Sequence, residues 1–565
     1  MRKKSIKVLS MLVLAVSVTT GCQLLKDVQY EVTPDPLEMH GDSVAVKVDI
    51  VFPEKGINKK ASAEITPMIG DTPLKSITVQ GEKATGNGSV VQYKAGGTVT
   101  YTDIVAYAPS MEASSLDVTG KIYKGTKEKG EIERTKIADA TIITPLLVNK
   151  DFKVVYATDN FRRVTQHTFD AQINYDKGKY NVKSAEMKDA DIAALDSFLV
   201  VAQTNPRIEI KSIQITGYAS PEGGAESNSE LSDNRAKSAM EAAMKVAKNA
   251  KNDTAQVEAT YKLTGSGEDF SGFEKAVKAS SMEQADQDLV IRTIQREENP
   301  DQAEADAKDL AMLFKELDKD VFPSLRRAEI VVNYDKIGFS DEELKSLSVS
   351  KPDTLNLEEL MYTATLSEDL NEKLRIYEHT EGRFGDDDAR VSNNTGAALY
   401  ELNRVAEAKA KFEKANGVED NVISKNNLGA VAGVEGDRVK AMELLNQANG
   451  AGSEVSYNKG ILHIQNGDYD AAIGSFNEAC FNKGLAQLLA GSAADGANTV
   501  EAANDESAHA YYLKAVASAR QDKAEGVISN LKMSFGIDSS LKTKASKDRE
   551  FLKWFEDASF TAIVK

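Results

Sequence analysis

Alternating apolar and polar residues in the first part of the chain give way to helical spacing towards its end. The period of two predicts strands, and these fall at residues 44–50, 98–102, 116–123 and 141–148. Glycine-containing turns separate the runs, as at Gly86-Asn87-Gly88. We therefore predict a β-sandwich over residues 28–147, which serves as a spacer or as a protein-binding module.

The C-terminal part of the chain is predicted to be helical, because residues 353–565 contain no proline. Small residues recur there at Gly396, Gly429 and Gly460, which are 33 and 31 residues apart. Each is followed at +12, +16 and +19 by matching residues, namely Ala408, Phe412 and Ala415, then Ala441, Leu445 and Ala448, then Ala472, Phe476 and Ala479.

This spacing resembles that of tetratricopeptide (TPR) repeats, in which small residues lie where paired helices touch. A helical solenoid of another class is the alternative. We predict leading helices within residues 337–385, repeats over 386–536 and a C-terminal capping helix over 537–565.

An asparagine precedes each reference glycine by two residues, at positions Asn394, Asn427 and Asn458. The resemblance to TPR proteins implies a concave groove that binds polypeptide. These asparagines are therefore candidates for binding the main chain of a protein partner. The alternative is that they are solvated polar positions.

The central part of the chain contains a strand, a turn and a helix in succession. Isoleucines predict a strand over residues 208–215, with a phase break at Lys211 and Ser212 that predicts a bulge. The turn follows at Pro221, and helical spacing runs from Asn228 through Arg235. A helix start beside the end of a strand is a common anion-binding position.

These residues resemble the signature of the OmpA-like peptidoglycan-binding domain. The resemblance predicts an α+β domain with a βαβαβ-type sheet over residues 148–336. Its matching positions are Asn228, Leu231, Ser232, Arg235 and Ala236, followed later by Gly265-Ser266-Gly267-Glu268 and Arg326-Arg327-Ala328-Glu329-Ile330.

The resemblance also implies a ligand, the diaminopimelate of the peptidoglycan stem peptide. In the family an aspartate and an arginine grip it, and Arg235 matches the arginine. Ser220 stands at the aspartate position, where it offers a hydrogen bond but no charge. Glu222 is a candidate for the missing carboxylate. The alternative is that Arg235 is structural and the domain does not bind peptidoglycan.

A helix-rich stretch of residues 269–323 interrupts this domain. Such a length predicts an inserted helical subdomain rather than a loop. With this expansion, the chain resembles the OmpA-like lipoproteins of Bacteroidetes-type bacteria. The insert is expected either to cover the ligand groove or to dock a protein.

The N-terminus predicts export and lipidation. A basic start, an apolar run and Thr19-Thr20-Gly21-Cys22 resemble a bacterial lipoprotein signal over residues 1–21. Cys22 is then the lipidated residue and residues 22–27 form a tether, which implies the outer membrane with the bulk of the chain in the periplasm. Simple secretion is the alternative.

Composition and motifs argue against catalysis and nucleic-acid binding. The net charge is −18, which is unsuited to binding nucleic acid. The five histidines are scattered, and no catalytic, metal-binding or nucleotide motif occurs. We expect no enzyme, metal or cofactor, but a lipoprotein that contacts peptidoglycan and recruits a protein partner. The alternative is an assembly or secretion scaffold that does not bind peptidoglycan.

Overall fold

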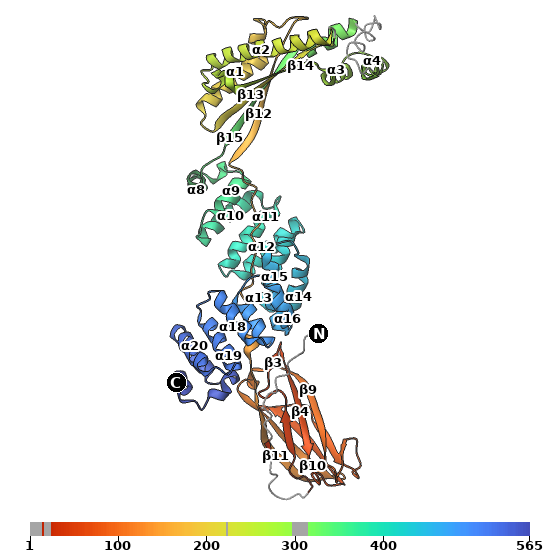
Figure 1. Cartoon of the computed structure of the whole chain (residues 1–565), viewed down its shortest axis with the longest axis vertical. Helices are drawn as coiled ribbons and strands as arrows, with labels where there is room; N and C mark the ends of the chain where they lie inside the picture. Colours follow the sequence, from red (N-terminus) through yellow and green to blue (C-terminus); the bar gives the residue numbers. More distant parts are fainter. Residues whose placement is uncertain (1–13, 16–23, 222–223, 297–314) are drawn as a thin grey trace. The chain divides into compact units, whose positions relative to one another are not determined.

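The computed structural model describes residues 14–15, 24–221, 224–296 and 315–565. Its contacts divide the chain into unit 1, made of Met1–Thr158 and Ser367–Lys565, and unit 2, made of Asp159–Leu366 (Figure 1). Cys22 and, apart from Leu14–Ala15 (β1), the predicted signal peptide lie outside the described residues. No helix of the described part has the length and apolar character needed to span a bilayer.

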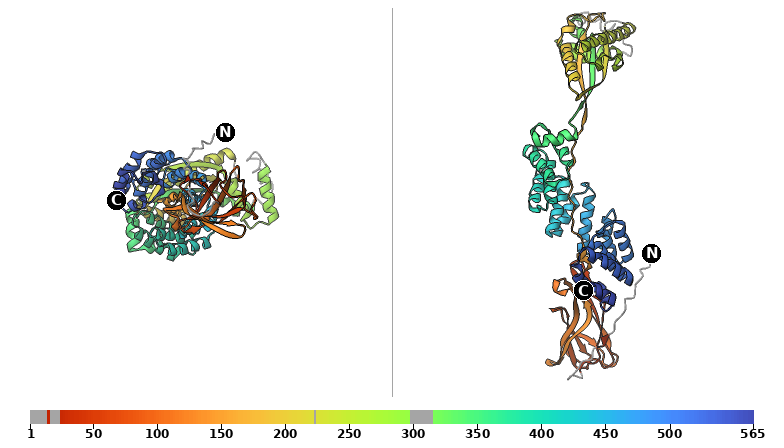
Figure 2. Two further views of the ribbon diagram at one scale, coloured as in Figure 1. Left: turned by 90° about the horizontal axis from the view of Figure 1, so that it is seen from below. Right: turned by 90° about the vertical axis from the view of Figure 1, so that its left-hand side faces the viewer.

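Two sheets form the N-terminal part of unit 1, which confirms the predicted sheet-rich region (Figure 2). Their inner faces are apolar, with alternate residues of the long strands buried. In the first sheet β4 (Ser43–Phe52) pairs with β2 (Gln29–Val32), β3 (Met39–His40) and β9 (Gly97–Ala106). The second has the order β11 (Lys127–Ala140), β10 (Ser114–Lys124), β5 (Ala61–Ile69), β7 (Ile77–Gly81) and β8 (Ser89–Val91), with β6 (Thr72–Pro73) on β5.

The predicted strand over residues 141–148 is wrong. Thr144–Leu147 form a 3-10 helix with Pro145 in its first turn. Proline has a fixed φ and no N–H group, so it suits a helix start and cannot donate to a sheet ladder. Upstream, Ile142 forms an isolated bridge with Glu38.

The C-terminal part of unit 1 is a helical repeat region, as predicted. After α10 (Leu370–Phe384), the helices pair along the chain. The pairs are α11 (Ala389–Glu401) with α12 (Val405–Val418), α13 (Val422–Glu435) with α14 (Arg438–Gln447), α15 (Ser453–Asn466) with α16 (Tyr469–Ser475), α17 (Phe481–Leu489) with α18 (Ala493–Ala502), and α19 (Ala508–Arg520) with α20 (Ala524–Ile537).

The reference glycines lie where the paired helices cross. A Cβ atom on Gly396 would be 2.7 Å from Phe412 Cε1, and one on Gly460 would be 2.5 Å from Phe476 Cζ. Both distances are too short for a real Cβ contact, so only glycine lets the large residue at +16 fill the space between the helices. The +16 periodicity therefore reports a direct contact.

The chain ends in three short helical segments where a single capping helix was expected. They are α21 (Leu541–Ala545), a 3-10 helix (Arg549–Trp554) and α22 (Ala558–Val564). Arg549 donates to the carbonyls of Ala113 and Ser114 in the sheet domain. The sheet domain and the end of the repeats are thus in contact within unit 1.

Unit 2 contains a sheet with helices packed on it. The strand order is β12 (Val164–Asn174), β15 (Arg327–Ile337), β13 (Ile208–Ala219) and β14 (Tyr261–Glu268). β15 is antiparallel to both of its neighbours, and β13 and β14 pair in parallel. The helices α1 (Ala190–Thr204) and α2 (Ala225–Asn249) share a core with the sheet. The predicted bulge at Lys211 and Ser212 is present as a register shift against β15.

The insert in unit 2 has its own small core, formed by Phe273, Val277, Val290 and Phe322. Its described elements are α3 (Phe270–Lys278), α4 (Gln284–Arg296), a π-helix (Leu317–Val321) and α7 (Phe322–Leu325), and residues 297–314 lie outside the described part. Two further helices, α8 (Asp341–Ser350) and α9 (Leu357–Thr365), complete unit 2. Membership of the OmpA-like family stays a prediction.

Candidate functional site

The most extensive buried polar cluster of unit 1 lies along the repeats. Helices α11, α13, α15 and α17 each contribute one asparagine two residues before a glycine, and all four side chains are at most 1 % exposed. They face residues 149–157, the extended segment that follows the sheet domain. Such buried amides are stable only if their donors and acceptors are paired.

Each asparagine binds both main-chain groups of one residue in this segment. Its Oδ1 accepts from the N–H, and its Nδ2 donates to the C=O. The distances are 2.7 and 2.9 Å for Asn394 on Ala157, 2.7 and 2.8 Å for Asn427 on Val155, 2.7 and 2.8 Å for Asn458 on Lys153, and 2.9 and 2.8 Å for Asn482 on Asn149. We call these four residues the asparagine ladder.

The ladder engages alternate residues because an extended chain turns the main-chain groups of every second residue to the same side. Asp151 is the alternate residue to which the ladder has no asparagine. Its carboxylate instead accepts a hydrogen bond from the Tyr457 hydroxyl at 2.8 Å. Burial, and then the hydrogen bond to Asp151, raise the pKa of Tyr457 well above its usual value, which keeps this donor protonated. The repeats therefore hold five alternate residues of one strand-like segment.

A second row of amides supports the ladder. Asn393 Nδ2 donates to Val155 O at 3.1 Å, and Asn426 Nδ2 donates to Lys153 O at 3.2 Å. Neighbouring helices are also linked, because Asn427 Nδ2 donates to Asn393 Oδ1 at 2.9 Å and Asn458 Nδ2 donates to Asn426 Oδ1 at 3.2 Å. A paired network of this kind fixes each amide in one orientation.

Side chains set the register of the bound segment. Phe152 is 3 % exposed and packs on Gly433 of α13, where an added Cβ would be 2.5 Å from its Cζ. Tyr156 stacks on Tyr377, and its hydroxyl donates to Glu401 at 2.9 Å. The main-chain bonds accept any sequence, whereas Phe152 and Tyr156 allow one alignment.

The sequence predicted three of these asparagines, and the structure brings them together on the chain's own residues 149–157. Asn482, Asn393, Asn426 and the segment itself were missed. A signal for Asn482 exists, since Asn482-Lys-Gly484 repeats the N-x-G pattern and Val500 lies at +16, 2.5 Å from an added Cβ on Gly484. Because α16 is short, Gly484 follows Gly460 by only 24 residues. A search for a period of 31 to 33 residues therefore does not find Asn482.

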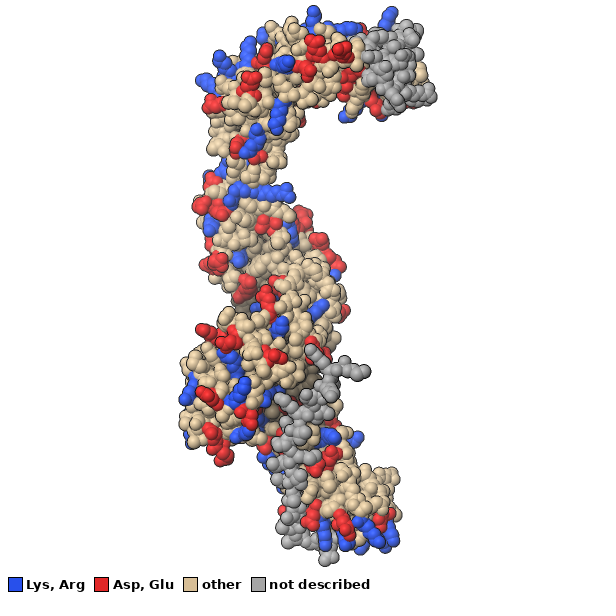
Figure 3. All heavy atoms as spheres, viewed as in Figure 1, with Lys and Arg blue, Asp and Glu red and all other residues tan. Residues whose placement is uncertain are grey.

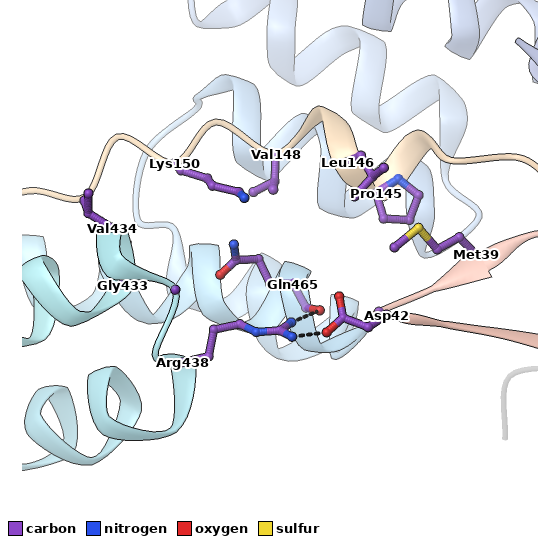
Figure 4. A pocket seen from close by; sticks show the side chains of 12 residues that line it. Met39, Asp42, Pro145, Leu146, Val148, Lys150, Gly433, Val434, Arg438 and Gln465 are labelled. Atoms are coloured by element: carbon purple, nitrogen blue, oxygen red, sulfur yellow. Dashed lines mark hydrogen bonds and ion pairs between the residues drawn. The ribbon is translucent and has the colours of Figure 1, made fainter. Parts of the chain in front are cut away.

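A pocket of about 250 Å³ lies beside the segment, between the repeats and the sheet domain (Figure 4). Pro145, Val148 and Val434 form apolar walls. At the rim Arg438 donates to Gln465 O at 2.7 Å and forms an ion pair with Asp42. The charge of Arg438 is thus paired with that of Asp42 at the rim of this pocket.

In unit 2, Arg235 of α2 is fully buried. Its Nε donates to Lys179 O at 3.0 Å, and its two terminal nitrogens donate to Tyr218 O at 2.7 Å and Asp176 O at 3.2 Å. The guanidinium carbon of Arg235 lies 5.3 Å from the centroid of the Tyr175 ring. The loop that follows β12 therefore covers this side chain, and its binding to peptidoglycan stays a prediction.

The other signature residues of unit 2 meet at the end of β13. Asn228 Nδ2 donates to Ser220 O at 3.3 Å and to Glu268 Oε1 at 2.6 Å. Ser220 is 4 % exposed. Glu222, the predicted carboxylate, lies outside the described residues. Glu268, which ends the Gly265-Ser266-Gly267-Glu268 motif, supplies a carboxylate here and was not among the predicted site residues.

Acidic and basic side chains are interspersed on the face drawn in Figure 3. Within the described ranges no group of three or more His, Cys, Asp or Glu side chains is placed to hold a metal ion.

No protein-family profile and no curated protein matches the chain. The solved structures similar to it include a tetratricopeptide repeat protein from Parabacteroides merdae ATCC 43184, with 15% identity over 38% of this chain and 91% of that one and a TM-score of 0.29. Another is YrrB, a TPR protein with an unusual peptide-binding site, with 18% identity over 29% and 92% and a TM-score of 0.25. A third is the APC/C hetero-tetramer Cut9–Hcn1, with 13% identity over 60% and 72% and a TM-score of 0.30. These values are low, so the helical-repeat description rests on the helix pairs of this chain.

Proposed function

We propose that this protein is a non-catalytic scaffold of the bacterial envelope that holds polypeptide. The observation that carries the proposal is the asparagine ladder, in which four buried side chains each bind both main-chain groups of one residue. A catalytic site needs reactive groups directed into a cleft. Here the buried asparagines of the repeats are hydrogen-bonded to a peptide segment.

The ladder closes the concave groove with the chain itself. Residues 149–158 lead from the sheet domain to unit 2, and the chain returns to unit 1 at Ser367. Unit 2 is therefore inserted between the bound segment and the repeats that bind it. A protein partner has to contact other surfaces of the scaffold or displace this segment.

The remaining parts of the proposal come from the sequence. Lipidation at Cys22 would attach the chain to the outer membrane and leave its bulk in the periplasm. Unit 2 would be an OmpA-like domain in which Arg235 is structural, because this side chain is fully buried and bound to three main-chain carbonyls. The scaffold would then act without gripping peptidoglycan through Arg235.

Co-sedimentation with purified peptidoglycan sacculi tests this role. We expect the mature chain to stay in the supernatant, while a known peptidoglycan-binding domain pellets as the positive control. Pelleting of the wild type that is lost in Arg235→Lys, with the fold intact by circular dichroism, would overturn the proposal.

A second candidate function, peptidoglycan contact, is favoured by the meeting of Ser220, Asn228 and Glu268 at the end of β13. Glu268 would replace the missing aspartate as the partner of the diaminopimelate ammonium. This function predicts pelleting that Glu268→Gln reduces at least tenfold, the loss expected for one charge-assisted bond. Glu230→Gln, an exposed carboxylate on the same helix as Asn228, is the matched control and should pellet like the wild type.

A further inference from the structure

Strand β9 has an open hydrogen-bonding edge. Its partner strand in the described part of the chain is β4, and β4 pairs with β2 on its other side. Thr33 N donates to Lys47 O at 3.1 Å, so the N–H and C=O groups of Lys47 point towards β2. Those of Val46 and Val48, the residues on either side, point towards β9. The alternation along antiparallel strands then turns the N–H and C=O groups of Thr100 and Thr102 away from β4.

The open edge carries little of the charge that usually protects such strands. Only one of the ten residues of β9, Asp103, is charged, and there is no proline. The edge strand β11 of the other sheet, in contrast, has eight charged residues among 14. Long edge strands without charge or proline are templates for pairing with another strand.

The bridge between Gln92 and Gly96 immediately precedes one end of this edge, and Asp103 covers the other. Its Oδ1 accepts from Ile104 N at 2.9 Å, and its Oδ2 accepts from Tyr101 OH at 2.9 Å. The exposed side chains of the strand are β-branched and uncharged over Thr98, Thr100, Thr102 and Ile104, the last being 72% exposed. Such side chains suit cross-strand packing.

We propose that β9 pairs antiparallel with β9 of a second copy of this chain, about a two-fold axis at Tyr101. Thr100 then lies opposite Thr102 of the second copy, and both belong to the set with open main-chain groups. In β4, Asp49 lies beside Thr100, and Lys47 lies beside Thr102. Lys47 Nζ lies 3.7 Å from Asp49 Oδ2 of the same strand, so each copy places an internally paired lysine and aspartate beside the junction.

A second copy fits this edge because two β9 strands meet without placing like charges opposite each other. The chain has a net charge of −18, so most contacts between copies bring like charges together. Pairing about Tyr101 places neutral threonines at the junction, so this contact avoids that repulsion. A two-fold axis also closes the assembly at a dimer, which prevents growth into a fibre.

Sedimentation velocity of the mature chain over a hundredfold concentration range measures the association. We expect a species of twice the chain mass that accumulates with concentration. Thr102→Pro should remain monomeric, because it removes an edge donor without breaking a bond to β4. Thr102→Val keeps the N–H group and should form dimers like the wild type. A wild type that stays monomeric, or dimers that Thr102→Pro leaves unchanged, would overturn the proposal.

Cross-linking tests the register independently of the proline variant. Under oxidising conditions, a mixture of Thr100→Cys and Thr102→Cys chains should give a covalent dimer. Each variant alone should give no more than the wild type, whose Cys22 and Cys480 set the background. Equal cross-linking in the separate variants and the mixture would contradict pairing about Tyr101.

Discussion

Asn427 and Val155 form a closed ring of two hydrogen bonds. The asparagine Oδ1 accepts from Val155 N at 2.7 Å, and its Nδ2 donates to Val155 O at 2.8 Å. The two residues are 272 positions apart in the sequence. This contact ties the segment before unit 2 to the repeats that follow it.

Replacing Asn427 by alanine should release the segment locally. Val155 N would lose its acceptor, and Val155 O would keep only the bond from Asn393. Asn393 and Asn426 would each lose one hydrogen bond to Asn427. We expect the free energy of local opening of residues 149–157 to fall by about 2–4 kcal/mol. Amide hydrogen exchange read by mass spectrometry measures this value. Asn449→Ala removes an exposed asparagine and should leave the exchange unchanged.

Gly433→Ala should disturb the same segment through the side chain of Phe152. The new methyl group would lie 2.5 Å from Phe152 Cζ, so the ring has to move. Overpacking of this kind costs about 1–3 kcal/mol. Chemical denaturation of the repeats measures the loss.

Two further variants test whether the loss in Gly433→Ala comes from contact with Phe152. Gly417 has nothing within 4 Å of an added Cβ, so Gly417→Ala should be neutral or slightly stabilising. Phe152→Leu should offset part of the Gly433→Ala loss. Strictly additive losses would show that the two side chains do not meet.

Asp548 should make the end of the repeats less stable at neutral pH than at mild acid. Burial, and then the nearby Glu550 carboxylate, raise the pKa of Asp548 to about 6. The folded state therefore takes up a proton between about pH 6 and the unfolded value near 4, and the contribution of this group to stability falls as pH rises through that window.

Asp548→Asn should remove this penalty. The amide can still accept from Glu550 N, and it can donate to the Tyr512 hydroxyl that now donates to Asp548. We expect the variant to be more stable than the wild type by about 1–3 kcal/mol at pH 7.5, with the difference shrinking towards pH 4.5. Urea denaturation followed by Trp554 fluorescence reports this region. A difference independent of pH would contradict the assignment.

Arg235→Met should destabilise unit 2 rather than only weaken a ligand site. The carbonyls of Asp176, Lys179 and Tyr218 would lose their donor. We expect a loss of about 3 kcal/mol or more, with faster exchange in residues 176–180. Lys237→Met on the exposed face of α2 is the control. Unchanged exchange in residues 176–180 would contradict the structural role of Arg235.

Several local features could be predicted from sequence because neighbouring residues produce them. The helix pairs follow from small and large residues at fixed spacing, and the bulge at Lys211 follows from a change of phase. Residues 141–148 were mispredicted for a local reason too, since Pro145 starts a 3-10 helix and overrides the apolar alternation.

Three features follow from the sequence alone: the repeats, the positions of Asn394, Asn427 and Asn458, and the suitability of these asparagines for binding main chain. Which main chain they bind depends on the folded arrangement of the chain. Hydrogen bonds to the main chain impose no sequence on the ligand, so the residues that the ladder binds share no pattern that marks them as bound. The burial of Arg235 was decided in the same way, because its carbonyl partners at Asp176 and Lys179 come from a loop more than 50 residues away. Periodicity reports which face of an element is apolar, whereas the segment that covers this face depends on contacts far apart in the chain.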